Sequence, residues 1–221
     1  MFVSESVPES GFELLSSPDS FRQTVSNLAS TATARVSFAT LYMGSEQLEE
    51  EVAGSIIDTA GRLPLGMCRI VVDGARCRRG LPESSETMFA RLCKQSQPIA
   101  LPQGRQLMFG RFCLPHHNWS LLSALGSLLR RPWSLPPAAL LESGGVQHSK
   151  VYAADEQVLL SGANLSEVYF RRRVDRWVLL KDPGLARAAH AWVEALGKAA
   201  GEATVGDSLV SGEGMVAREV V

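Results

Sequence analysis

The feature that most constrains the fold is an almost continuously apolar run, VSFATLYM, from Val36 to Met43. A run of this kind is expected of a strand buried on both faces, as in a sheet covered by helices on each side. A helix is predicted before it, because Phe21, Val25 and Leu28 recur at helical spacing after a Ser-Pro helix start. This order of elements favours an α/β fold.

The alternation continues along the chain. Ser45 is the predicted cap of a helix that reaches Ala60, with four glutamates crowding its first turns. Met67 to Val72 is a second short apolar strand, and Met88 to Leu92 is predicted to be helical. The order helix, strand, helix, strand predicts α/β layering with a mainly parallel sheet.

The carboxyl-terminal part is predicted to add three strands and a last helix. Between the two parts, residues 96–145 hold six of the eleven prolines and give no clear prediction. The predicted elements are strands over Val146 to Ala153, Gln157 to Leu160 and Val174 to Leu180, and a helix over Leu185 to Ala199.

The length of 221 residues and a hydrophobic fraction of 45% are enough for one full α/β core. We expect a domain over residues 14–200, a flexible amino terminus over 1–13 and a flexible Gly- and Ser-rich tail over 201–221. A formal net charge of -1 argues against a strongly basic nucleic-acid binder. Four cysteines without CxxC spacing are interpreted as reduced thiols.

One group of residues carries recognisable chemistry. His148 and Lys150 are two apart on a predicted strand, so both side chains should leave the same face of the sheet. A neutral imidazole beside a fixed ammonium suits attack on a phosphodiester, with the lysine offsetting charge on the phosphoryl oxygens. Asp155, predicted at the strand end where a structural or orienting carboxylate fits, is grouped with His148 and Lys150 as a predicted catalytic residue.

Three residues further along fit the same chemistry. Gly162 and Asn164 open the next loop, where a small residue admits a phosphate and an amide can donate to it. Asp175, at the start of the following strand, is predicted to hold the other ring nitrogen of His148. Taken alone, the spacing is weak evidence, since a single histidine on a strand is more often a structural residue.

The complete pattern H-x-K-x4-D-x6-G, followed by Asn164 and Asp175, resembles that of the phospholipase D superfamily. Within it, SGANLSEVYFRRRVDRWVLL, from Ser161 to Leu180, resembles the CDP-diacylglycerol–glycerol-3-phosphate 3-phosphatidyltransferases of eukaryotes. Three earlier segments resemble the same family: LLSSPDSF, SFATLYMGSEQLEEE, and DGARCRRG followed by SSETMFARL. The resemblance implies a phospholipase D-like mixed sheet flanked by helices.

The chain departs from the superfamily pattern in two ways. Gly162-Ala163-Asn164 is one residue shorter than the general G-S-x-N. The superfamily also needs two motifs that face each other, whereas this sequence holds one. A second motif is therefore expected from a missing carboxyl-terminal half or from the partner in a homodimer.

The resemblance implies phosphatidyl transfer from CDP-diacylglycerol to glycerol 3-phosphate. His148 would attack the phosphorus and expel CMP, giving a phosphatidyl-histidine. Lys150 would bind the phosphoryl oxygens, Asp175 would orient His148, and a histidine of the second motif would serve as acid and then base. No cofactor or metal is expected.

Other readings of the function remain open. A sister enzyme, such as a phosphatidylserine or cardiolipin synthase or a phosphodiesterase, would differ in the acceptor. A non-catalytic lipid-binding half is an answer of a different class. Family resemblance implies the mitochondrial inner membrane as a peripheral protein, although Met1 to Ser17 has neither arginine nor lysine and no targeting peptide is visible.

Several basic and aromatic residues have two readings each. Arg76, Arg78 and Arg79, in a loop after a strand, are predicted to hold glycerol 3-phosphate or pyrophosphate oxygens, or else form a solvated basic loop. His116 and His117 are interpreted as ordinary loop residues. Arg171 to Arg173 are predicted either to contact phospholipid headgroups or to be solvated. Trp119 to Leu141 is predicted either to lie in the membrane interface or to form a core helix with a proline-rich loop.

Overall fold

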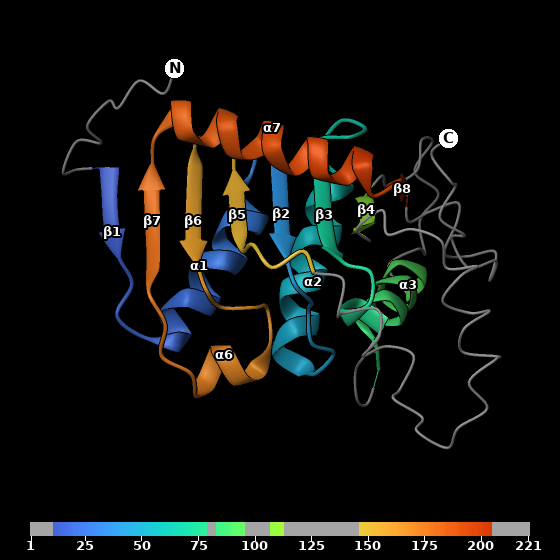
Figure 1. Ribbon diagram of the computed structural model, residues 1–221, viewed down its shortest axis with the longest axis horizontal. Helices are drawn as coiled ribbons and strands as arrows, with labels where there is room; N and C mark the ends of the chain where they lie inside the picture. Colours follow the sequence, from blue (N-terminus) through green and yellow to red (C-terminus); the bar gives the residue numbers. More distant parts are fainter. Residues whose placement is uncertain (1–10, 79–82, 96–106, 113–145, 205–221) are drawn as a thin grey trace, which may run out of the picture.

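The computed structural model describes residues 11–78, 83–95, 107–112 and 146–204. Their strands form one mixed sheet in the order β1-β7-β6-β5-β2-β3-β4-β8 (Figure 1). Strands β2, β3 and β4 are parallel to one another, and all other pairings are antiparallel.

The elements have the following bounds. The strands are β1 (Phe12–Leu14), β2 (Val36–Thr40), β3 (Cys68–Asp73), β4 (Leu107–Phe112), β5 (Val151–Ala154), β6 (Gln157–Ser161), β7 (Trp177–Lys181) and β8 (Ala203–Thr204). The helices are α1 (Pro18–Thr31), α2 (Gln47–Ala60), the short 3-10 helix η2 (Arg76–Arg78), α3 (Ser85–Gln95), α6 (Glu167–Arg171) and α7 (Pro183–Ala199).

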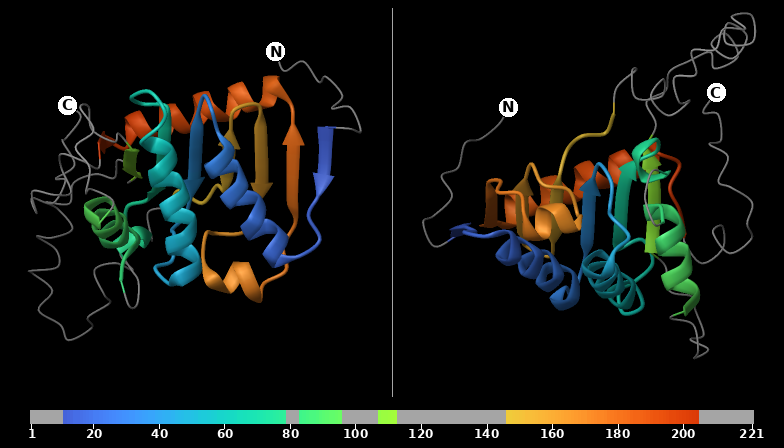
Figure 2. Two further views of the ribbon diagram at one scale, coloured as in Figure 1. Left: turned by 180° about the vertical axis from the view of Figure 1, so that it is seen from behind. Right: turned by 90° about the horizontal axis from the view of Figure 1, so that it is seen from below.

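Helices cover both faces of the sheet. Figure 2 shows α1, α2 and α3 on one face, whereas α7 runs across the other face. Each face of the sheet packs against its helices in a separate hydrophobic core. The strands contribute side chains to both cores, since successive side chains point to opposite faces. Phe38 and Tyr152 belong to the main core beneath α1 and α2, while their neighbours Ala39 and Ala153 lie beneath α7.

The first helix begins as its sequence predicts. Ser17 is the amino-terminal cap and forms a reciprocal capping box with Ser20, and Pro18 takes the first helical position. The apolar positions of α1 then pack on aromatic residues of the sheet. The Phe21 ring stacks on Trp177 with centroids 5.7 Å apart, which joins the first helix to β7.

Three predicted boundaries were wrong. The strand predicted over Val146 to Ala153 begins only at Val151, and the one predicted from Val174 begins at Trp177. Residues 146–150 and 174–176, which precede these two strands, do not pair with neighbouring strands. Both segments lie at the end of the sheet that carries the predicted motif. Ser45 does not cap α2, because its hydroxyl donates to the carbonyl of Glu83 at 2.6 Å and Glu46 takes the cap position.

The sheet also extends beyond the predicted domain boundaries. Strand β1 pairs with β7 and strand β8 pairs with β4, and the sequence predicted neither. Next to β8, Glu202 forms a bidentate ion pair with Arg69, at 2.6 and 2.9 Å, and both side chains are almost fully buried. The residues just after position 200 are therefore tied into the fold.

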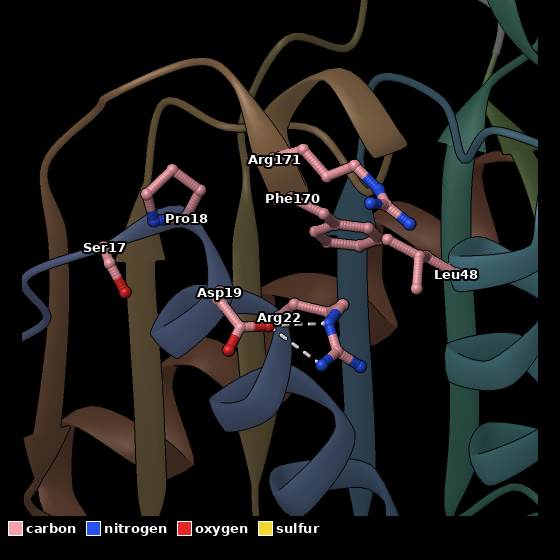
Figure 3. A pocket seen from close by; sticks show the side chains of 7 residues that line it. All are labelled: Ser17, Pro18, Asp19, Arg22, Leu48, Phe170 and Arg171. Atoms are coloured by element: carbon pink, nitrogen blue, oxygen red, sulfur yellow. Dashed lines mark hydrogen bonds and ion pairs between the residues drawn. The ribbon is translucent and has the colours of Figure 1, made fainter.

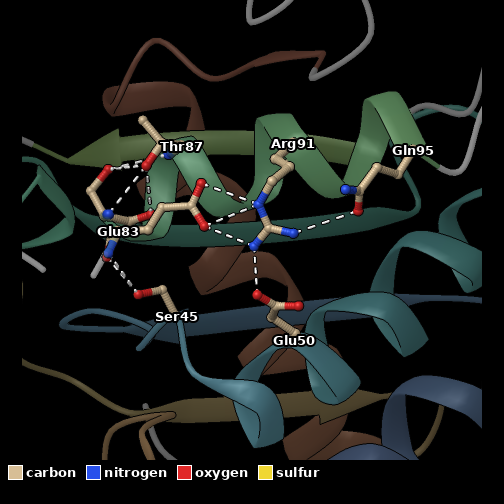
Figure 4. A network of polar contacts seen from close by, with 7 residues as sticks. Ser45, Glu50, Glu83, Thr87, Arg91 and Gln95 are labelled. Carbon is tan, nitrogen blue, oxygen red and sulfur yellow. Dashed lines mark hydrogen bonds and ion pairs between the residues drawn. The ribbon is translucent and has the colours of Figure 1, made fainter. Parts of the chain in front are cut away.

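Helix α3 is longer than predicted and is anchored by a polar network (Figure 4). Arg91 bridges Glu83, which lies just before α3, and Glu50 of α2. These two carboxylates raise the pKa of the Arg91 guanidinium, so the side chain stays charged. The network holds α3 beside α2, and the loop that carries Glu83 beside Ser45.

Two further expectations concern the described part of the chain. Cys68, Cys77 and Cys93 are free thiols, as the sequence predicts, while Cys113 lies outside the described residues. Among the described helices, none has the length and apolar character needed to cross a membrane.

Candidate active site

The predicted motif lies where the chain approaches β5. Residues 146–150 are not in a strand but precede it (Figure 1). This segment is held to the neighbouring strand β3, because the Gln147 amide donates to Asp73 Oδ2 at 3.0 Å. Continuing the β2–β5 register places Lys150 opposite Thr40, at the carboxyl end of β2. The motif therefore lies at the carboxyl ends of two parallel strands, where α/β sheets commonly bind ligands.

Asp73 organises this end of the sheet, and the sequence analysis missed it. One carboxylate oxygen accepts from Gln147, and the other accepts from the amides of Ala75 and Arg76 at 3.0 and 2.9 Å. An acidic residue at the end of a buried strand, followed directly by Gly74, is the signal that was available. Asp73 thus fixes the start of the motif against the arginine loop.

His148 and Lys150 are brought together as predicted, although by a bent segment rather than a strand. Lys150 Nζ lies 3.0 Å from His148 Nδ1 and 3.2 Å from Nε2, and it donates to the His148 carbonyl at 2.6 Å. The imidazole is exposed, whereas the lysine is only 5% exposed. An accessible base beside a fixed ammonium is the arrangement that the phosphodiester chemistry requires.

The surroundings favour the neutral form of the histidine. Desolvation first, then the positive charges of Lys150 and Arg76, lower the pKa of His148 below its ordinary value. Burial lowers the pKa of Lys150 too, and the negative charge of Asp175 acts in the opposite direction. A neutral imidazole has the lone pair that a nucleophile needs at neutral pH.

Asp175 joins the group, but through Lys150 rather than His148. Its carboxylate fills the space over Gly162, because a Cβ there would lie 2.7 Å from Asp175 Oδ2. Neither oxygen of Asp175 hydrogen-bonds to His148 among the contacts of the described residues, so its orienting role stays a prediction. The sequence analysis predicted that the small Gly162 leaves room for a phosphate. In the structure the Asp175 carboxylate occupies that space.

Asn164 lies nearby in a buried polar cluster. Its side-chain oxygen accepts from the Thr40 hydroxyl at 3.4 Å, and Tyr152 donates to the carbonyl of Ala163 at 2.7 Å. Tyr152 is fully buried, and burial is the main cause that raises the pKa of its hydroxyl, so it stays protonated. The loop after β6 is thereby tied to the carboxyl end of β2.

Asp155 is not brought to His148. It lies at the far end of β5, in the turn to β6, with a positive φ of 48°. Its carboxylate accepts from Thr33 Oγ1 and from three successive amides, those of Thr33, Ala34 and Arg35, at 2.9–3.0 Å. Burial alone would raise its pKa, but these hydrogen bonds outweigh it and lower the pKa. The geometry fits the structural reading of Asp155.

The arginine loop is only partly described. Arg76 begins η2 and is close enough for its charge to lower the pKa of His148. Arg78 ends η2, while Arg79 lies outside the described residues. The segments with His116, His117 and Trp119 to Leu141 also lie outside them. Among the described residues, no group of three or more His, Cys, Asp or Glu is placed to hold a metal ion.

A separate groove of about 550 Å³ opens between α1, α2 and α6 (Figure 3). None of the predicted catalytic, supporting or acceptor-phosphate-binding residues lines it, although Arg171 of the predicted headgroup-binding stretch does. Its cations are paired, since Arg22 contacts Asp19 and Glu51, and Arg171 contacts Glu167. The groove is distinct from the His148 site.

The chain is similar in sequence to several curated phosphatidyltransferases. The chain is 34% identical over 222 residues to the mitochondrial CDP-diacylglycerol–glycerol-3-phosphate 3-phosphatidyltransferase of Gallus gallus, covering 95% of this chain and 36% of that protein. It is 31% identical over 175 residues to the enzyme of Schizosaccharomyces pombe, covering 79% of this chain and 31% of that protein. The chain is homologous to one part of these phosphatidyltransferases. It spans about a third of the length of the curated relatives that it matches. No family model matches it.

Solved structures confirm the predicted fold. A phosphatidylserine synthase of Haemophilus influenzae superposes with a TM-score of 0.59 at 22% identity, over 85% of this chain and 37% of that chain. The phospholipase D family member Nuc of Salmonella typhimurium superposes with a TM-score of 0.53 at 12% identity, over 87% of this chain and 97% of that chain. The mixed sheet with flanking helices is thus the fold of the phospholipase D family.

Proposed function

We propose that this phosphatidyltransferase homologue transfers a phosphatidyl group from CDP-diacylglycerol to glycerol 3-phosphate, with His148 as the nucleophile. The observation that carries the proposal is the exposed His148 imidazole held 3.0 Å from the buried Lys150 ammonium, at the carboxyl ends of β2 and β3. Homology to enzymes named for this transfer supports this choice of substrates.

The first step forms a bond from an imidazole nitrogen of His148 to the diacylglycerol-bearing phosphorus, and the bond from that phosphorus to CMP breaks. The departing CMP oxygen takes a proton from a second histidine. Lys150 offsets the charge that develops on the phosphoryl oxygens. Because Lys150 already contacts the imidazole, those oxygens would take over its hydrogen bonds as they enter.

The second step reverses the proton transfer. The second histidine takes the proton of a glycerol 3-phosphate hydroxyl, that oxygen bonds to phosphorus, and the bond from His148 to phosphorus breaks. The products are phosphatidylglycerophosphate and free His148. Arg76 and its loop, including Arg78 and Arg79, are proposed to bind the phosphate of the acceptor, since guanidinium groups donate in pairs to such oxygens.

The second histidine must come from another copy of the motif. The described fold matches 97% of the Nuc chain, so one unit of this size makes a whole chain in that protein. In this protein we propose that either a second copy of the chain or the remaining part of the relatives' length faces His148. The homologues named mitochondrial support a mitochondrial location, and we propose the inner membrane as the site of peripheral association, which subcellular fractionation tests.

The decisive experiment measures CMP release from CDP-diacylglycerol in neutral detergent micelles, with the molar mass recorded by light scattering. Continued release beyond one CMP per site that requires both glycerol 3-phosphate and His148 supports the transfer, with His148→Ala as the inactive variant and Lys181→Met, at the opposite end of the sheet, as the control. Release with serine alone would support a phosphatidylserine synthase, and release without acceptor a hydrolase. A folded monomer without release would contradict catalysis by this chain alone.

A further inference from the structure

A short segment between the candidate active site and solvent combines arginines with exposed valines. Residues 168–176, here called the basic segment, run from α6 to the start of β7 and contain four arginines against one acidic residue, Asp175. Val174 is 84% exposed and Val168 is 46% exposed. Exposed apolar side chains flanked by arginines suit contact with a membrane interface, where apolar groups enter the headgroup region and basic groups meet lipid phosphates.

The arginines of the basic segment differ in their contacts. Arg171 pairs with Glu167 at 2.7 Å, and Arg173 lies over the Tyr169 ring, 5.0 Å from its centroid. Arg172 and Arg176 are exposed and form no ion pair within the described residues. Their charges are the ones available to an external anion.

The basic segment lies at the same end of the sheet as the candidate active site (Figure 1). Asp175 provides the physical link, because it belongs to the segment, fills the space over Gly162 and acts electrostatically on Lys150. Any surface that binds the basic segment would therefore lie on the same side of the protein as His148. The groove in Figure 3 is a poorer candidate, since its two arginines are already paired.

We infer that the basic segment is a membrane-docking surface: Arg172 and Arg176 bind the phosphates of anionic lipid headgroups while Val168 and Val174 enter the interface. Lipid is favoured over a polynucleotide because the exposed side chains between the arginines are aliphatic, whereas single-stranded nucleic acid is bound by exposed aromatic rings. The assignment to a lipid partner rests in part on the proposed function, which needs a diacyl substrate delivered to His148.

Sedimentation of the full chain with vesicles tests the inference without any enzymatic readout. Vesicles of phosphatidylcholine alone are compared with vesicles of phosphatidylcholine and phosphatidylglycerol in equal parts. We expect binding only to the anionic vesicles, weakened by salt. The double variant Arg172→Gln and Arg176→Gln should weaken binding about 25-fold, because each arginine near an anionic surface contributes about fivefold. Val174→Ser should weaken it several-fold.

The matched control removes the same formal charge at the opposite end of the sheet, through Lys181→Gln and Arg187→Gln, both exposed. Equal loss in the control and the test variant would overturn the inference, since net charge alone would explain the binding. It would also be overturned by absent binding to anionic vesicles, by displacement with soluble glycerol phosphate, or by stronger competition from single-stranded DNA. CMP release in neutral detergent micelles is scored separately, so failure of the transferase proposal is distinguishable from failure of membrane docking.

Discussion

The carboxylate of Asp175 occupies the space that a side chain at Gly162 would need. A Cβ on Gly162 would lie 2.7 Å from Asp175 Oδ2, closer than real contacts allow, and 3.1 Å from Oδ1, which is a tight contact. Asp175 in turn is the acidic group whose charge counteracts the lowering of the Lys150 pKa by burial. A residue without a side chain therefore determines where the counter-charge of the motif lysine lies.

We predict that Gly162→Ala destabilises the protein by about 1 to 3 kcal/mol, because the methyl group must displace the carboxylate. In an Asp175→Ala background the same change should cost much less, since the clashing group is gone. Urea unfolding of the four proteins measures this coupling.

Gly54→Ala is the matched control. It lies in α2 with nothing within 4 Å of an added Cβ, so it should stabilise the helix slightly and independently of Asp175. Equal costs of Gly162→Ala with and without Asp175 would show that the carboxylate does not hold this position.

The sequence predicted the core elements of this fold for physical reasons that the structure confirms. Val36 to Thr40 is buried at every position, as expected of a strand in an almost continuously apolar run. The helix start at Pro18 follows from a cap residue and a proline at the first position, whereas α7 begins at Pro183, two residues before the predicted Leu185. These signals are local, so they can be read without knowing the partner segments.

The elements that were missed depend on distant partners. Strand β1, only three residues long, exists because Phe12 to Leu14 pairs with β7, some 165 residues away along the chain. His148 and Lys150 leave the ladder because Asp73 holds the Gln147 amide. The spacing of the motif indicated that His148 and Lys150 meet, but only tertiary contacts decide that Asp155 binds Thr33 and that the Asp175 carboxylate lies over Gly162.

The His148 pKa should rise when its positive neighbours are removed. Lys150→Met takes away a like charge 3.0 Å from the ring, so the pKa should move up toward the ordinary value of 6.5. Arg76→Gln should produce a smaller rise. Titration of the imidazole protons by NMR, assigned with His148→Ala, gives both values.

Lys181→Met is the charge-matched control, because Lys181 ends β7 at the opposite end of the sheet. A His148 pKa that stays constant in Lys150→Met would contradict the close approach of the two side chains. The titration also predicts how activity depends on pH. The rate of CMP release should increase as pH rises through the His148 pKa, since only the neutral imidazole attacks.

The buried Arg69–Glu202 pair should make residue 202 essential to the fold. Glu202→Ala leaves a guanidinium without its partner, so we expect a loss of about 3 to 5 kcal/mol in urea unfolding. Glu156→Ala, at an exposed turn, should change stability by less than about 0.5 kcal/mol. If Glu202→Ala and Glu156→Ala both changed the stability only slightly, Glu202 would not contribute to the fold, and the domain would end near position 200 as the sequence predicts.

Asp155 should contribute stability rather than chemistry. Asp155→Asn weakens the hydrogen bonds to Thr33, Ala34 and Arg35, and charged acceptors make the loss about 2 to 4 kcal/mol at neutral pH. Asparagine tolerates the positive φ, so strain does not confuse the comparison.

The pH dependence of that loss has a defined sign. The folded-state pKa of Asp155 is lowered from 3.8, so its stabilisation is fully present above that value and is lost as pH falls through the lower, folded-state pKa. The difference between wild type and Asp155→Asn should therefore shrink in acid and stay constant above about pH 5. Asp58→Asn, at an exposed position of α2, is the matched control. A stability difference that is the same in acid and at neutral pH would mean that the ionised carboxylate does not hold the Thr33–Arg35 turn.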